Sequence, residues 1–199
     1  MATAEDGSLA SRIPAAPSDA ETNPVGQLPH WLFAGGDTLA INAFRALALI
    51  LADGRFAEGA GEEELGACLE EAMRLYPTTT ILSRETLAET EWGGATVPAG
   101  AQVLIPNFFL HRDRDRFEYA DRFAPERWLS GEAGEEWSFN HLSRGPQGCP
   151  GGALSLLLGK AALATVLDRR AAALESPSLD TVKPLPHMLD FFAVRARIA

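Results

Sequence analysis

The chain has little of what marks secreted, nucleic-acid-binding or membrane-spanning proteins. Its 199 residues include only two cysteines, Cys68 and Cys149, which provide no disulfide framework and favour a reducing, cytoplasmic location. Seventeen lysines and arginines stand against 27 acidic residues, and the net charge of −10 argues against nucleic acid as a partner. No basic stretch precedes an apolar core near the N-terminus, so no signal peptide is predicted. The longest apolar run, residues 39–51, is too short for a membrane span and contains Asn42 and Arg45.

The composition separates a tail from a folded portion. Residues 1–27 are rich in alanine, serine, proline and acidic residues, and we expect a disordered or extended segment there. Hydrophobic residues make up 46% of the whole chain, which indicates a packed globule over residues 28–199.

Hydrophobic periodicity predicts a mainly α fold with a small antiparallel β-sheet. The expected elements are a helix from residue 29 or 30 to 51 with Asp53-Gly54 as its C-cap, a helix over 62–76, short strands within 78–109, a helix over about 151–172 and a strand-like segment over 191–198.

One cysteine stands in a loop with little helix or strand propensity. Residues 139–152 read FNHLSRGPQGCPGG, so glycines and prolines surround Cys149. An apolar helical run follows, and backbone N–H groups at its start favour a thiolate over a thiol. A flat, bulky partner could approach the sulfur closely. For the loop alone, a free thiol in an ordinary surface turn is an equally good interpretation.

Three further segments hold polar residues in unusual settings. Glu71 and Arg74 share a helix face, which by itself predicts only a surface pair contributing about 0.2–0.5 kcal/mol. Arg127 lies between a phenylalanine and a tryptophan, where pairing with a carboxylate is favoured. Residues 34–38 read AGGDT, with two glycines inside a predicted helix. Because each glycine costs about 1 kcal/mol there, either close approach of a ligand or a helix–helix crossing is expected.

In their order along the chain, these four segments resemble the cytochrome P450 family. AGGDT is similar to the distal-helix motif, and residues 71–74 match the family's Glu-x-x-Arg. PERW at 125–128 matches the segment whose arginine, here Arg127, would close a structural triad with Glu71 and Arg74. The loop from Gly145 to Gly151 matches the cysteine-ligand loop, although Leu142 and Gln147 stand where the family usually has phenylalanine and a basic residue. The resemblance covers residues 24–199, which correspond to the C-terminal half of a chain about twice as long.

The resemblance implies a partial cytochrome P450 fold, from the distal helix through the cysteine-ligand loop to the final helix, and a haem-thiolate monooxygenase that binds haem b. Cys149 would be the axial ligand of the haem iron. Asp37 and Thr38 would be the catalytic pair that relays protons to bound dioxygen, beside a notch opened by Gly35 and Gly36. The implied cofactor-binding residues are Cys149, Arg84, Gly35, Gly145 and Gly151.

The resemblance also implies partners. They are a small organic substrate contacted by residues 78–82 and the Pro186-His187 turn, a ferredoxin- or flavoprotein-type electron donor, and a possible complementing N-terminal half. No nucleic acid and no membrane span are expected. Two alternatives remain open: a truncated pseudoenzyme that binds no haem, and a haem-binding module without turnover. Little unaided activity and some self-association are expected, because the helices over 38–51 and 153–167 are apolar over wide faces.

Overall fold

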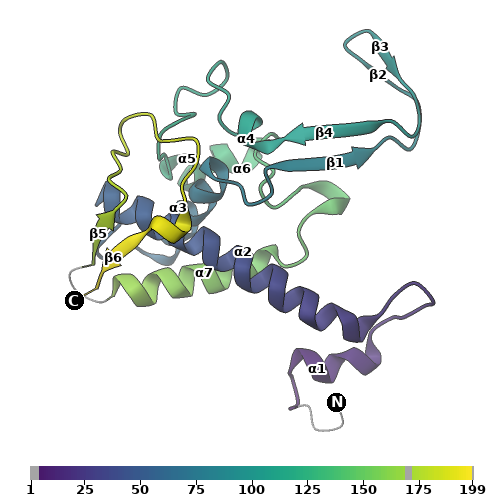
Figure 1. Cartoon of the computed structure of the whole chain (residues 1–199), viewed down its shortest axis with the longest axis horizontal. Coiled ribbons are helices and arrows are strands. Elements are labelled where there is room, and N and C mark those ends of the chain that lie inside the picture. The colour runs from purple at the N-terminus through teal and green to yellow at the C-terminus, as the bar shows by residue number, and fades with distance from the viewer. Residues whose placement is uncertain (1–4, 169–171, 199) are drawn as a thin grey trace.

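Three helices carry most of the core in the computed structural model, which describes residues 5–168 and 172–198 (Figure 1). They are α2 (Pro24–Asp53), α3 (Glu62–Leu75) and α7 (Gly152–Leu167), and each packs against the other two. Fully or nearly fully buried apolar side chains fill the space between them. Prominent among these are Leu49, Ile50, Leu69, Leu75 and Leu163.

The first long helix begins earlier than the sequence analysis predicted. Asn23 is its N-cap, its side chain accepting a hydrogen bond from the backbone N–H of Gly26, and Pro24 occupies a first-turn position that tolerates proline. Pro29 therefore lies inside α2 rather than at its start. The predicted end is confirmed: Gly54 is left-handed, with φ 79°, and its N–H bonds to the carbonyl of Ile50.

The helix predicted over 62–76 is also confirmed, as α3. The last helix, α7, ends at Leu167, short of the predicted residue 172, and residues 169–171 lie outside the described part of the chain.

Two antiparallel strand pairs form an arm that projects from the helices (Figure 1). Strand β1 (Ile81–Glu85) pairs with β4 (Gln102–Pro106), and β2 (Thr90–Trp92) pairs with β3 (Ala95–Val97) through a Gly93-Gly94 turn. Both glycines have positive φ, as a tight hairpin turn requires. The antiparallel prediction for residues 78–109 is confirmed.

A third antiparallel pair lies near the C-terminus. Strand β5 (Ala173–Ser176) pairs with β6 (Arg195–Arg197). The strand-like segment expected over 191–198 is shorter than predicted, because Phe191–Ala193 forms a 3-10 turn, η3, whose N-cap Asp190 accepts a hydrogen bond from Phe192 N.

Short helical elements connect these parts. They are α1 (Leu9–Arg12), η1 (Ile13–Ala15), α4 (Asn107–Leu110), α5 (Glu126–Leu129), α6 (Glu132–Glu135) and η2 (Gly145–Gln147).

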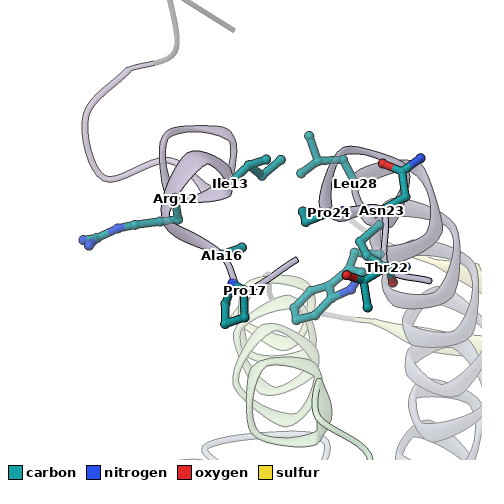
Figure 2. Close-up of a pocket in the computed structure, with 10 residues that line it drawn as sticks. Arg12, Ile13, Ala16, Pro17, Thr22, Asn23, Pro24 and Leu28 are labelled. Atoms are coloured by element: carbon teal, nitrogen blue, oxygen red, sulfur yellow. The ribbon is translucent and has the colours of Figure 1, made fainter. Parts of the chain in front are cut away.

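The N-terminal segment has more structure than the disordered or extended tail that composition predicted. Within residues 5–23 the chain forms α1 and η1, and residues 1–4 lie outside the description. Together with the first turns of α2, this segment borders a mainly apolar cavity of about 340 Å³. Figure 2 shows Ile13, Leu28 and Pro24 gathered around it, while the Arg12 side chain points away.

In length and composition α2 could cross a membrane, a property that the sequence analysis missed by considering residues 39–51 alone. Core helices pass the same test. The second half of α2 belongs to the core, since residues 46–50 are buried and α2 packs against α3 and α7.

Candidate functional site

The Cys149 loop is held by its own backbone. Cys149 N donates to the carbonyl of Leu142 at 2.7 Å, and Gly152 N donates to the carbonyl of Cys149 at 3.1 Å. Gly145 adopts a φ of 62°, which favours glycine, and Gly151 is the N-cap of α7. Leu142 packs against the main core. The thiol is therefore exposed on a fixed loop at the N-terminal end of a 16-residue helix.

Cys149 and the AGGDT segment border one cavity. Its volume is about 200 Å³ and its lining is mainly apolar. Helix α2 contributes one wall, and the cysteine loop with the first turn of α7 contributes the other. The lining residues are His30, Trp31, Ala34, Gly35, Cys149, Pro150, Gly151, Leu154 and Ser155. Three of the residues expected to bind the cofactor, Gly35, Cys149 and Gly151, thus line one cavity.

The lining of the cavity suits a largely apolar group that carries its own metal ligands. A Cβ atom built on Gly35 would meet no atom within 4 Å, so there is open space at that point of α2. In the described part of the chain, no cluster of three or more His, Cys, Asp or Glu side chains could hold a bare metal ion. A metal bound at Cys149 would therefore need ligands of another origin, such as those of a porphyrin.

The other predicted cofactor-binding and catalytic residues do not line the cavity beside Cys149. Asp37 is exposed and Thr38 half-buried, and over residues 5–168 and 172–198 neither side chain forms a hydrogen bond. Neither lines the cavity beside Cys149. Arg84 lies on β1, where its guanidinium donates to the carbonyl of Ser83 at 2.8 Å. Gly145 shapes the loop without lining the cavity.

The Glu71–Arg74 pair is fully buried, unlike a surface pair. Two guanidinium nitrogens of Arg74 each lie 2.7 Å from a carboxylate oxygen of Glu71. Arg74 also donates to the carbonyls of His111, Ala120 and Arg122 at 2.7, 2.9 and 3.0 Å. Such a pair holds its surroundings in place, because removing one partner leaves an uncompensated buried charge.

The expected triad with Arg127 is wrong. Arg127 instead pairs with Glu132 at 2.7 Å, with both side chains about half exposed, and this hydrogen bond raises the pKa of Arg127. The other hydrogen bonds to the Glu71 carboxylate come from Trp128, the residue after Arg127, and from Ala124. Trp128 Nε1 and the backbone N–H of Ala124 each donate at 2.8 Å. Neighbouring residues on the short helix α5 point in different directions, and here the indole points inward.

A buried histidine, His111, joins the ion pair to the segment that leads into the cysteine loop. His111 Nδ1 lies 3.1 Å from the carbonyl of Arg74, and His111 Nε2 accepts a hydrogen bond from the backbone N–H of Asn140 at 3.1 Å. Burial lowers the pKa of His111 to about 4 and that of His141 to about 3, so both are neutral near pH 7. The sequence analysis assigned no role to His111, because partners on the backbone leave no spacing signal.

The expected substrate-contact segments meet in a different cavity. Thr80 and His187 line a space of about 780 Å³ together with Phe108, Phe109 and Met188. Cys149 does not line that space. The cysteine loop and the expected substrate contacts are thus not joined in one cavity.

Comparison with known proteins gives a consistent picture. A family model described as "Cytochrome P450" matches residues 64–187. The chain is 30% identical over 161 residues to a protein named "Probable cytochrome P450 4s3" from Drosophila melanogaster, covering 74% of this chain and 32% of that protein. It is 38% identical over 103 residues to cyclooctat-9-en-7-ol 5-monooxygenase from Streptomyces melanosporofaciens, covering 51% of this chain and 22% of that protein.

Solved structures agree with the sequence comparison. CYP175A1 from Thermus thermophilus matches with a TM-score of 0.67 and 24% identity, over 83% of this chain and 43% of that one. A cytochrome P450 from a second strain of the same species matches with a TM-score of 0.66 and 25% identity, over 81% and 43% of the two chains. The chain spans about a third or less of these curated relatives and under half of these solved structures.

Proposed function

The chain belongs to the cytochrome P450 family, and from this premise we propose that it forms the cysteine-ligand side and the distal helix of a haem-thiolate monooxygenase. One observation carries the proposal: Cys149 and Gly35, from separate elements, line the same apolar cavity. The sulfur of Cys149 would hold the iron of haem b in this cavity. A thiolate ligand supplies the electron density that favours O–O cleavage.

The residues of the chain then divide into two groups. The cavity walls, among them Pro150 and Leu154, would exclude water from a bound haem, and Asp37 and Thr38 of α2 would supply protons for dioxygen chemistry. The buried Glu71–Arg74 pair and His111 would keep the cysteine loop in position, since their hydrogen bonds run from α3 to Asn140.

Substrate and electron donor follow from the family. Cytochrome P450 proteins generally oxidise organic substrates with electrons from redox partners. For this chain we propose a small organic molecule, bound near Thr80 and His187, and a ferredoxin- or flavoprotein-type donor. The two cysteines, one buried and one exposed, form no disulfide, which supports the cytoplasm as the location.

Exposed apolar side chains support a complementing polypeptide. They lie on α2 and α7, and comprise Trp31, Leu32, Phe33, Phe44, Leu154, Leu157 and Leu158. Exposed apolar surface on this scale marks an interaction surface. Light scattering of the isolated chain should show self-association, and a strictly monodisperse monomer would contradict this part of the proposal.

The central test is the spectrum of the haem-loaded protein. The ferrous carbon monoxide complex should show the red-shifted Soret band of thiolate ligation, and Cys149→Ser should abolish it. Cys68→Ser is the matched control, because Cys68 is fully buried in the core and burial raises the pKa of its thiol. Loss of the band in the Cys68 variant alone would overturn the assignment.

A haem-binding module without turnover is the second candidate. It is favoured by the exposure of Asp37 and by the absence, within the described residues, of any hydrogen bond to the Asp37 or Thr38 side chain. A haem-loaded chain with thiolate ligation that consumes no reductant above the rate of free haem would support the module. Product formation coupled to electron consumption would support the monooxygenase.

A further inference from the structure

The cavity beside Cys149 has a second residue that can bind a metal. His30 lies on its α2 wall, and Cys149 lies on the wall made by the cysteine loop. Histidine and cysteine are thus placed on two sides of one mainly apolar space. The role proposed for this cavity uses the cysteine alone.

His30 also continues the helix stripe that the proposed function uses. His30, Ala34 and Thr38 are spaced by four residues, so they follow one another along one face of α2. His30 and Ala34 both line the cavity. A group lying against Ala34 therefore meets the His30 side chain one turn closer to the N-terminus of the helix.

The chemistry of the lining selects His30 as a ligand. Among the α2 residues that line the cavity, only His30 has a side-chain nitrogen with a free lone pair, because the indole nitrogen of Trp31 is a donor only. Within the described residues the His30 imidazole has no hydrogen-bond partner, and its exposed side chain is free to change rotamer. Imidazole nitrogen is the commonest protein ligand of metals.

We propose that His30 is the second axial ligand of the iron, opposite Cys149, in the ferric resting state. This inference rests on the proposed function and adds regulation to the same site. A six-coordinate iron has no open position, so the Fe–N bond to His30 must break before dioxygen or carbon monoxide can bind. The imidazole leaves as a neutral base, and no electron or proton is needed for the exchange.

The test is a rescue experiment on the haem-loaded full chain. Electron paramagnetic resonance and absorption spectra of the ferric protein should show nitrogen–thiolate ligation. His30→Ala should lose that signature, and free imidazole should restore it, whereas the wild-type spectrum should not change with imidazole. Carbon monoxide should also bind ferrous His30→Ala faster than wild type. Gln27→Ala is the matched control, because Gln27 is an exposed polar residue of the same helix that does not line this cavity, and its replacement should leave both spectra and rates unchanged.

The outcomes separate this inference from the proposed function. A ferric spectrum that is identical in wild type and His30→Ala, together with a thiolate-type carbon monoxide band, overturns the role of His30 and leaves Cys149 as ligand. A chain that binds no haem, or whose thiolate band survives Cys149→Ser, overturns both. An imidazole response in wild type equal to that of the variant also overturns the role of His30.

Discussion

Replacing Trp128 by phenylalanine should destabilise the fold more than removing the Arg127 side chain. The indole N–H of Trp128 donates to the buried carboxylate of Glu71 at 2.8 Å. A hydrogen bond to a charged group contributes about 1.5–3 kcal/mol, and phenylalanine keeps most of the ring packing against Phe139 while losing that bond. The Arg127–Glu132 pair is about half exposed, and a pair of this kind contributes about 0–1 kcal/mol.

The expected difference between the two variants is therefore about 1–2 kcal/mol in the free energy of unfolding. Urea denaturation followed by far-ultraviolet circular dichroism measures it without relying on tryptophan fluorescence. Trp137→Phe is the matched control, because Trp137 is 69% exposed and lies away from Glu71. An Arg127→Ala variant that loses as much stability as Trp128→Phe would show that Arg127 does complete the buried pair and that the reasoning here is wrong.

Three further predictions follow from the same structure. Because burial lowers the pKa of His111 to about 4 from its ordinary 6.5, the unfolded chain binds a proton between these values that the folded chain excludes. The free energy of unfolding should be constant above pH 6.5 and decline toward pH 4. Urea denaturation at a series of pH values should show a weaker pH dependence for His111→Gln than for wild type. Gly159→Ala should lower the thermal midpoint, because its Cβ would lie 2.5 Å from a buried leucine of α3. Gly35→Ala, with open space, should instead raise the midpoint, because alanine adds about 1 kcal/mol of helix propensity, while weakening haem uptake in a haemin titration. Thr38→Ala, assayed with the complete monooxygenase, should divert electrons to peroxide, and unchanged coupling would remove Thr38 from the proton relay.

Local features of the chain were predictable where their cause is local. Gly54 ends α2 because a left-handed residue favours glycine, and both Gly54 and the acidic first turn of α3 can be read from neighbouring residues. The loop around Cys149 was predictable for the same reason, since its glycines and prolines disfavour regular structure. The start of α2 was missed because Pro29 was taken for a boundary, although Asn23-Pro24 has the better cap and first turn.

Features that depend on distant contacts were not predictable from the sequence. Nothing in the sequence PERW says whether the arginine or the tryptophan of α5 points toward Glu71, because both are long side chains with donors. His111 was left without a role since its partners are a backbone carbonyl of α3 and a residue 29 positions further along the chain. The family resemblance alone implied that Gly35 and Cys149 serve one site, because the two residues are more than one hundred positions apart and their shared cavity appears only in the structure.

The bonds of Arg74 also suggest an order of folding. Its pairing with Glu71 spans only three residues and can form as soon as α3 is helical, whereas its carbonyl partners lie 37, 46 and 48 residues further along the chain. Closing such loops costs conformational entropy before the contacts repay it. We therefore expect α3 to form early as a template and the segment from residue 111 to 122 to settle on it late. Because each doubling of a loop costs only about 0.6 kcal/mol, the β1–β4 arm enclosed by these contacts could lengthen with little loss of stability.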